Sequence, residues 1–309
     1  MAFDLSQYLV VGISSRALFD LSDEDRIFNE EGLEAYRAYQ LAHENEVLPP
    51  GTGFPLVNAL LRLNELDTDG RRVEVVIMSR NSSETSLRIF NSIDHYGLDI
   101  TRAALTGGAP LAAYLHAFDV DLFLSRDPGD VERGLASNIA SALLYDVPAE
   151  PGAHLDQIRI AFDGDSVLFS DEADRIYREH GLEAFQAHER EHARRPLPEG
   201  PFAKLVKSLA EIRAAEDPSV PSIRTALVTA RNSPAHERVI RTLMDWGVSV
   251  DETFFLGGMS KQNVLQAFKP HMYFDDQPRH CDSAAGRVPT GRVPSVDEPD
   301  GSSIDDGYH

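Results

Sequence analysis

The chain has 309 residues, and its shares of hydrophobic (42%) and charged (26%) residues are typical of a globular protein. Its formal net charge of −21 excludes a broad basic surface, so we expect no nucleic-acid partner. No apolar run reaches the length of a membrane span, and the single cysteine, Cys281, excludes an intrachain disulfide framework. The sequence therefore predicts a cytoplasmic protein with no membrane partner.

Segments about 150 residues apart along the chain carry similar sequences. "DEDRIFNEEGLEAY" (23–36) matches "EADRIYREHGLEAF" (172–185), "IMSRNSS" (77–83) matches "LVTARNSP" (227–234), and "LTGG" (105–108) matches "FLGG" (255–258). Several matches in the same order indicate an internal duplication. We therefore expect two homologous halves, residues 1–148 and 155–285.

Each half alternates short apolar runs with amphipathic segments at helical spacing. The runs expected to form buried parallel strands include "LVVGI" (9–13), "VEVVIM" (73–78), "QIRIAF" (157–162) and "IRTALV" (223–228). This alternation predicts an α/β fold made of two doubly wound, Rossmann-like halves, whose ligands bind beyond the carboxyl ends of the strands.

Two charged segments and the end of the chain depart from this alternation. Segments 22–66 and 171–220 are rich in helix-forming residues and follow the first strand of each half, so we expect them to form helical caps. The Pro- and Gly-rich segment 286–309 has few apolar residues to bury, and we expect it to be disordered.

One helix is expected within residues 233–247. Ser233 can cap its start, Pro234 suits the first helical position, and Ile240, Leu243 and Met244 fall on one face.

Polar side chains follow four of the expected strands in the second half. They are Asp163, Asp165, Thr229, Lys261, Asp275 and Asp276. The carboxyl ends of parallel strands meet at one edge of a sheet, so these groups are expected to converge. Carboxylate oxygens are the ligands that Mg²⁺ prefers, and a lysine with a hydroxyl can bind phosphate. The sequence therefore predicts a site for Mg²⁺ and a phosphate group.

Acid–base chemistry assigns a role to each group. Asp163 is expected to attack phosphorus, since a carboxylate with an ordinary pKa of about 3.9 needs no base to activate it. Mg²⁺ and Lys261 would relieve its repulsion by the phosphate. Asp165, two positions further on, is expected to protonate the leaving oxygen. Thr229 and the amides of residues 231–233 would hold phosphoryl oxygens.

The first half lacks these groups. Position by position, the first half has Ile13 and Ser15 in place of the two aspartates, Met78 in place of the threonine, and Leu124 and Ser125 in place of the last aspartate pair. We therefore expect the second half to be catalytic, and the first to serve packing, capping or regulation.

These motifs together resemble a known superfamily. "FDGDSVLFSDE" (162–172), "LVTAR" (227–231), a later lysine and "YFDDQ" (273–277) resemble the haloacid dehalogenase (HAD-like) phosphatases. "ISSRALF" (13–19), "YQLAHENE" (39–46), "NSIDHYGL" (91–98) and "TGG" (106–108) resemble one branch of it, the cytosolic 5′-nucleotidase type I family. The likeness extends over about residues 8–280 of the chain.

The resemblance implies Mg²⁺-dependent hydrolysis of nucleoside 5′-monophosphates, AMP prominent among them. It implies that Asp163 is both nucleophile and metal ligand. Asp165 would be the acid/base and would also bind the metal through its carbonyl. By the same resemblance, Thr229 and Lys261 hold phosphate, and Asp275 and Asp276 complete the metal site. The family's sequence after this last motif is not matched here.

Two other patterns receive structural interpretations. "HEREH" (188–192) has the spacing of a zinc-protease motif, but it lies in a charged cap without an obvious third ligand, so we expect no zinc. Arg231 and Asn232 recur in the first half as Arg80 and Asn81, which favours a role in a turn rather than in catalysis.

Two alternative functions stay open. The chain could be a HAD-type phosphatase for another small phosphate ester, since the cap determines the substrate. It could also be a nucleotide-binding regulatory protein. The sequence leaves open the preferred base and whether the chain forms a homo-oligomer.

Overall fold

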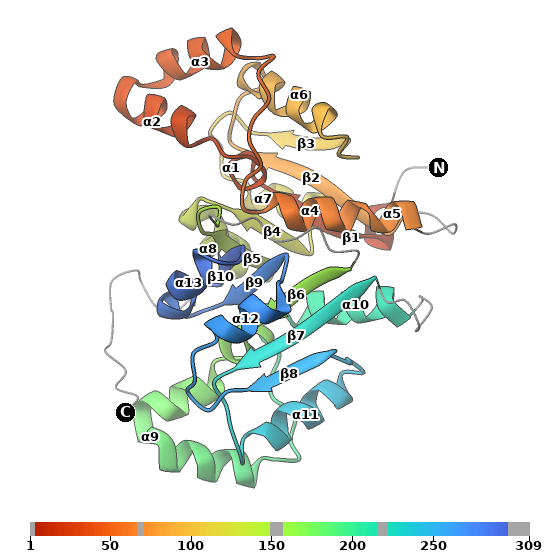
Figure 1. Cartoon of the computed structure of the whole chain (residues 1–309), viewed down its shortest axis with the longest axis vertical. Coiled ribbons are helices and arrows are strands. Elements are labelled where there is room, and N and C mark those ends of the chain that lie inside the picture. The colour runs from red at the N-terminus through yellow and green to blue at the C-terminus, as the bar shows by residue number, and fades with distance from the viewer. Residues whose placement is uncertain (1–3, 67–70, 149–156, 215–221, 296–309) are drawn as a thin grey trace. The chain divides into compact units, whose positions relative to one another are not determined.

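The computed structural model describes residues 4–66, 71–148, 157–214 and 222–295. The chain divides into two compact units, unit 1 (residues 1–148) and unit 2 (residues 149–309) (Figure 1). Both units are mixed α/β structures with parallel strands.

Unit 1 is built on five parallel strands in the order β3-β2-β1-β4-β5. The strands are β1 (Leu9–Ile13), β2 (Val73–Ser79), β3 (Arg102–Leu105), β4 (Leu122–Ser125) and β5 (Ala140–Leu144). Its helices are α1 (Ser15–Leu18), α2 (Ser22–Glu31), α3 (Leu33–Ala42), α4 (Phe54–Leu61), α5 (Leu63–Leu66), α6 (Leu87–His95), α7 (Ala112–Ala117) and α8 (Pro128–Ala136), with short 3-10 turns at Leu5–Gln7 and Glu84–Ser86.

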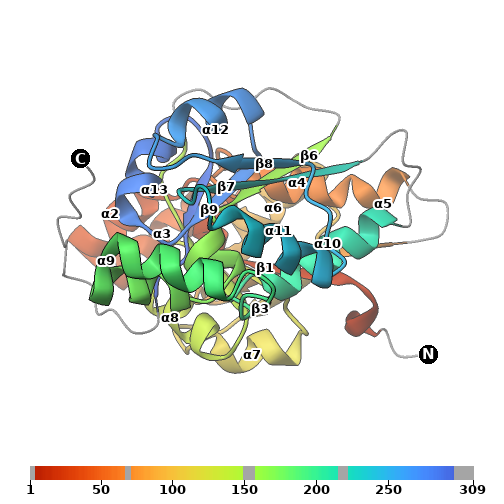
Figure 2. The same cartoon turned by 90° about the horizontal axis from the view of Figure 1, so that it is seen from below.

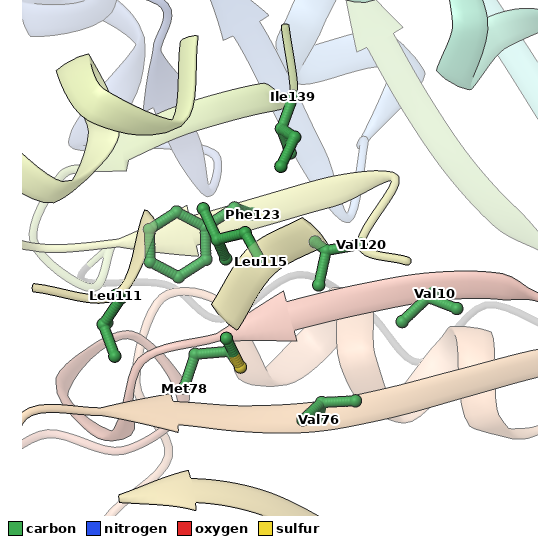
Figure 3. Close-up of a cluster of buried hydrophobic side chains, with 8 residues drawn as sticks. All are labelled: Val10, Val76, Met78, Leu111, Leu115, Val120, Phe123 and Ile139. Atoms are coloured by element: carbon green, nitrogen blue, oxygen red, sulfur yellow. The ribbon is translucent and has the colours of Figure 1, made fainter. Parts of the chain in front are cut away.

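Apolar side chains fill both faces of the unit 1 sheet. On one face, Val10, Val76 and Phe123 pack against Leu111 and Leu115, at the start of α7 and within it (Figure 3). Side chains alternate between faces along a strand, so the buried Ile13 of β1 points to the opposite face, near the start of α4. Burial on both faces explains why β1 and β2 are mostly apolar, and the buried Glu74 of β2 is paired with Arg71 and Arg102.

The strands of unit 2 lie in the order β8-β7-β6-β9-β10. When the strands of each unit are counted along its own chain, this is the same order as in unit 1. The strands are β6 (Ile158–Phe162), β7 (Ile223–Thr229), β8 (Glu252–Phe255), β9 (Met272–Asp275) and β10 (Thr290–Arg292). A π-helical turn, η3 (Gly164–Leu168), follows β6, and the helices are α9 (Glu172–Glu191), α10 (Ala203–Ala214), α11 (His236–Asp245), α12 (Gln262–Phe268) and α13 (Pro278–Ala285). Figure 2 shows α12 and α13 on one face of this sheet and α10 and α11 on the other.

A glycine bends the helical segment that follows the first strand in each unit. Gly32 separates α2 from α3, and Gly181 lies at a kink inside α9. Their φ angles are +87° and +79°, a region that side chains with a Cβ rarely adopt. The repeated "GLEA" motif therefore marks the same bend in both units.

The four predicted strands are confirmed, with β2 and β7 each extending one residue further, to Ser79 and Thr229, and β6 beginning one residue later, at Ile158. The expectation of disorder over residues 286–309 is wrong for its first part. β10 lies in this segment and pairs with β9, and Val288 and Val293 are buried beside it. Residues 296–309 lie outside the described residues.

The prediction for residues 233–247 is wrong at the helix start and about the buried face. α11 begins at His236, and Met244 is 73% exposed. The buried face instead includes Arg238, whose guanidinium contacts Glu189 (2.8 Å). Ion pairing allows a charged side chain to be buried, and apolar periodicity alone cannot detect this.

Candidate active site

The carboxyl ends of β6, β7 and β9 bring three polar residues together in unit 2. Asp163 directly follows β6, and its backbone N–H donates to the carbonyl oxygen of Phe274 (2.8 Å). Thr229 and Asp275 are the last residues of β7 and β9. Because β6 pairs in parallel with both neighbours, all three residues lie at one edge of the sheet. All three are buried.

Lys261, which precedes α12, binds two of these carboxylates. Its ammonium nitrogen lies 2.8 Å from Asp163 Oδ1 and 2.7 Å from Asp275 Oδ2. The lysine is only 4% exposed, so its charge depends on these two partners. Tyr273, also buried, donates its hydroxyl to Asp275.

Three carboxylates crowd around this point. Asp163, Asp275 and Asp276 each offer an oxygen, and these oxygens lie within 4.8 Å of one another. No other group of three metal-ligating side chains is found in the part of the chain that the structure describes. Oδ1 of Asp276 is buried without a hydrogen-bond partner among those residues. An all-oxygen donor set with one unsatisfied oxygen fits a divalent cation such as Mg²⁺.

The electrostatics of the site also favour a cation. Burial raises the pKa of Asp163 to about 7 despite the nearby Lys261, and Asp275 adds to the rise. Burial and the nearby Asp275 raise the pKa of Asp276 well above its usual value. Burial opposes ionisation of Asp275 too, but Lys261 and His280 outweigh it and hold its pKa well below the usual range. Negative charge is therefore in excess here.

Asp165 is held by a different partner. Arg231 donates to both of its carboxylate oxygens, from Nε (2.7 Å) and from Nη2 (2.6 Å). Such a two-point contact between guanidinium and carboxylate sets orientation as well as charge. The guanidinium also lies over the ring of Phe185 in α9, 5.5 Å from its centroid.

Arg231 is itself positioned by a buried network. Its Nη1 donates to Glu189 (2.5 Å), and Glu189 accepts a second bond from Arg238 (2.8 Å). Both arginines and the glutamate are buried. Helices α9 and α11 thus support the orientation of Asp165 through Glu189.

Comparison with known proteins places this geometry in context. The sequence matches the 5′-nucleotidase family over residues 1–299. The chain belongs to the 5′-nucleotidase family. It is 38% identical over 287 residues to the human protein named cytosolic 5′-nucleotidase 1B. The match covers 89% of this chain but 47% of the human protein, so the chain spans about half the length of that relative.

No solved structure matches this 5′-nucleotidase family member significantly. Among the described residues, no helix combines the length and the hydropathy that crossing a membrane requires.

The structure brings most of the residues expected from sequence into one place. Asp163, Lys261, Asp275 and Asp276 converge as expected. Thr229 Oγ1 lies beside them and accepts from the Arg231 N–H (3.2 Å). The carboxylate of Asp165 is outside the carboxylate group and bound by Arg231. The roles assigned to these six residues stay predictions.

Backbone hydrogen bonds correct the alignment of the two units at the first aspartate. The Ser14 N–H donates to Leu124 (2.9 Å), as the Asp163 N–H donates to Phe274. Ser14 is therefore the counterpart of Asp163, and the pairing with Ile13 is wrong. The turn η3 after β6 has five residues where α1 has four, and a constant offset cannot detect this extra residue.

The same correction applies at the end of the second strand. The carbonyl of Thr229 accepts from Leu256 (2.9 Å), and that of Ser79 accepts from Thr106 (3.0 Å). Ser79 rather than Met78 is thus the counterpart of Thr229 in this 5′-nucleotidase family member.

Arg231 binds Asp165, and the sequence interpretation left it out of the site. Its N–H bonds to the Thr229 hydroxyl just as the Asn81 N–H bonds to that of Ser79 (3.1 Å). Its counterpart is therefore Asn81, and the recurrence as Arg80 that favoured a turn role does not hold. A constant offset of 150 residues pairs Arg231 with Asn81, whereas matching the two Arg-Asn pairs shifts the alignment by one residue.

The counterparts of Asp275 and Asp276 in unit 1 also differ by one residue from the predicted ones. β4 and β9 end at Ser125 and Asp275, so Ser125 and Arg126 stand opposite Asp275 and Asp276. The predicted counterparts, Leu124 and Ser125, are wrong by one residue.

The "HEREH" motif has a structural role. Glu189 is buried between two arginines, and the His188 ring bonds to Glu172 (3.0 Å). His188 and His192 stack with ring centroids 4.1 Å apart, and neither belongs to the metal-ligating group found among the described residues. That the motif binds no zinc stays a prediction.

Proposed function

We propose that the chain hydrolyses nucleoside 5′-monophosphates, AMP first among them, at the carboxylate site of unit 2. The observation that carries the proposal is the buried cluster of Asp163, Asp275 and Asp276 around the Lys261 ammonium. Family membership and the name of the human relative support the same activity. That name also supports a cytoplasmic location for this chain.

Mg²⁺ is the cation proposed for this cluster. The carboxylates of Asp163, Asp275 and Asp276 would hold it, together with the backbone carbonyl of Asp165. When bound, the cation would neutralise charge on the phosphate and on the attacking carboxylate. Its presence would also favour the ionised form of Asp163, whose pKa burial raises to about 7.

In the first step, an Asp163 oxygen would attack phosphorus while the bond from phosphorus to the nucleoside O5′ breaks. Asp165 would donate its proton to that oxygen, which releases the nucleoside and leaves an aspartyl-phosphate. In the second step, Asp165 would take a proton from water as the water attacks phosphorus, which restores Asp163 and releases phosphate. Lys261 and Thr229 would hold the phosphoryl oxygens.

The acid role sets a requirement on Asp165. In this structure both of its oxygens accept from Arg231, so one of these contacts must give way before the carboxyl can face a leaving group. Catalytic hydrogen bonds often form only in the complex with substrate. Arg231 would then keep Asp165 oriented through its remaining contact and through Glu189.

An aromatic pair near the site supports a substrate that carries a base. Tyr177 and Phe185 of the cap helix α9 form an edge-to-face contact with ring centroids 6.3 Å apart. Phe185 lies against Arg231, which in turn holds Asp165. A planar base can pack on such rings while its phosphate reaches the carboxylates.

A substrate panel tests the proposal. Phosphate release from AMP, IMP and ribose 5-phosphate should be compared by kcat/KM with and without Mg²⁺. We expect Mg²⁺-dependent release and a preference for the nucleotides. Phe185→Leu should raise KM for AMP and leave ribose 5-phosphate unaffected. Equal use of ribose 5-phosphate would contradict the assigned substrate class, and no release from any ester would contradict the activity.

The fold has a proposed origin as well. We infer that the two units are homologous HAD-like halves, with α9 belonging to the cap of the catalytic half. The shared strand order and the repeated glycine bend support a duplication.

A further inference from the structure

Unit 1 contains a cavity of about 480 Å³ that the proposed chemistry does not use. It is lined by the ends of β1, β2 and β4, the edge that carries the carboxylates in unit 2. Pockets for small molecules have volumes of about 300–1,000 Å³. Unit 1 therefore lacks the carboxylates and the lysine of the unit 2 site but contains a cavity large enough for a small-molecule ligand.

Serine hydroxyls replace the carboxylates at the strand ends of this cavity. Ser15 and Ser79 bond to each other (3.1 Å), and Ser125 accepts from the Asp127 N–H (3.1 Å). Ser14, the counterpart of Asp163, is 9% exposed and lines the cavity. Its hydroxyl has no hydrogen-bond partner among the described residues, and such a buried group favours a ligand that can bond to it.

Arginines line the cavity in place of a metal site. Arg126 stands where unit 2 has Asp276, and Arg16 and Arg80 lie beside it. The Arg126 guanidinium bonds to Asp146, a side chain that is 88% exposed, and surface pairs of this kind are weak. Arg80 contacts carboxylates through Nη2, while its buried Nε has no partner among the described residues. These guanidiniums suit a phosphate group.

A pair of aromatic side chains lines another part of the cavity. Phe28 of α2 and Tyr36 of α3 meet edge to face, with ring centroids 5.9 Å apart. Phe28 is 49% exposed, although it is a large apolar side chain beside the cavity. The pair occupies the same place relative to the glycine bend as Tyr177 and Phe185 in unit 2. A planar base would cover its exposed ring.

We propose that the unit 1 cavity binds a nucleoside 5′-phosphate without a metal ion and without hydrolysing it. The arginines and the Ser14 hydroxyl bind the phosphate, and the Phe28–Tyr36 pair packs against the base. No carboxylate stands at the position of Asp163, so the bound phosphate meets no nucleophile of that kind. This inference concerns a second site and does not depend on the activity proposed for unit 2.

Calorimetric titration of the full chain tests this site. The chain carries Asp163→Asn, so that AMP is not consumed, and the buffer contains EDTA. Without a cation the remaining carboxylates of unit 2 repel phosphate, so we expect one AMP per chain. Arg126→Ala and Arg16→Ala should each weaken binding by about tenfold or more, since a bond to a charged group is lost.

Arg26 provides a matched control. It forms a surface pair with Glu30 (3.4 Å), and neither residue lines the cavity. Arg26→Ala removes the same charge and should leave AMP affinity unchanged. Phe28→Ala should weaken AMP binding but not the binding of inorganic phosphate, which has no base.

Three results would overturn the proposal. They are no AMP binding in EDTA, equal affinity in the wild-type and Arg126→Ala cavities, and equal losses from Arg126→Ala and Arg26→Ala. Thermal melting of each variant identifies any that fails to fold. Arg16 is half-exposed and provides an independent substitution if Arg126→Ala is unstable.

Discussion

Charge burial governs the behaviour of individual residues at the unit 2 site. Asp163, Lys261 and Asp275 are nearly inaccessible to water, and each is stable there only through the others. Removing one partner of such a group leaves an uncompensated buried charge, which costs about 3–5 kcal/mol. Substitutions here therefore act on stability as well as on chemistry, and every activity measurement needs a melting curve beside it.

Arg231 is the first residue to test. Arg231→Lys keeps the charge but loses the two-point contact with Asp165, so we expect kcat on AMP to fall at least about tenfold. The pH profile of kcat should change as well, because Asp165 would lose its oriented partner. Arg241→Lys is the control, since Arg241 forms a surface pair with Glu237 and should leave kcat unchanged. Equal effects of the two substitutions would contradict the positioning role.

The raised pKa of Asp163 predicts that metal binding depends on pH. Its pKa is 3.8 in the unfolded chain and about 7 in the folded, metal-free chain. Between these values the folded state binds more protons, so metal-free stability should fall as pH rises towards 7. Mg²⁺ requires the ionised carboxylate, so its affinity should be about tenfold lower at pH 6 than at pH 8.

Thermal shift titrations with Mg²⁺ at the two pH values check this prediction. A larger stabilisation at pH 8 is expected, and Asp163→Asn should reduce the difference between the two pH values. The same Mg²⁺ affinity at pH 6 and pH 8 would contradict the assignment of Asp163 as a ligand.

Residue types and order were sufficient to predict Asp163, Asp275 and Asp276 from sequence, because these residues lie at or directly after the ends of readable strands. Asp163 and Asp275 follow apolar runs, and parallel pairing brings such ends together. Arg231 was not predictable in the same way. Its orientation depends on Glu189, which is distant in sequence and buried only in the folded structure.

At the scale of elements, tight turns connect the cap segments to the sheet in both units. The Gly51 N–H donates to Leu18 (2.8 Å), and the Gly200 N–H donates to Leu168 (2.9 Å). A Cβ at Gly200 would lie 2.3 Å from the carbonyl oxygen of Phe169, which no real contact tolerates. The turn therefore requires glycine, and it holds the returning chain against η3, which carries Asp165.

Gly200→Ala should accordingly destabilise unit 2. Forcing a methyl group against backbone atoms costs about 1–3 kcal/mol, and the thermal midpoint should fall by several degrees. Gly286→Ala is the matched control, because a Cβ there meets no atom within 4 Å and its φ is −69°. If both variants melt at the same temperature, the close approach at Gly200 is not a constraint.

At this scale the sequence predicts the strands, but it does not predict which face of a helix is buried. β1, β2, β6 and β7 are apolar because both of their faces are covered, so the sequence pattern alone reveals them. α11 was read from its apolar residues, but its buried face depends on Arg238 and the ion pair with Glu189. β10 was missed because a three-residue strand in a Pro- and Gly-rich segment carries little pattern of its own.

At the scale of the whole molecule, two units share one strand order and differ in the groups at their strand ends. Unit 2 presents carboxylates and a lysine, and unit 1 presents serines and arginines. The central claim is that unit 2 performs the chemistry through Asp163 and that unit 1 performs none. Any residual hydrolysis after loss of Asp163 would therefore have to come from elsewhere in the chain.

The most direct test is phosphate release from AMP by the full chain in Mg²⁺, compared with Asp163→Asn. Asp282→Asn, at an exposed aspartate, is the control for loss of a carboxylate. We expect Asp163→Asn to fold and bind AMP but to release phosphate at least about a thousandfold more slowly than the wild type. Asp282→Asn should release phosphate at the wild-type rate. A folded Asp163→Asn that releases phosphate at the wild-type rate would contradict the account.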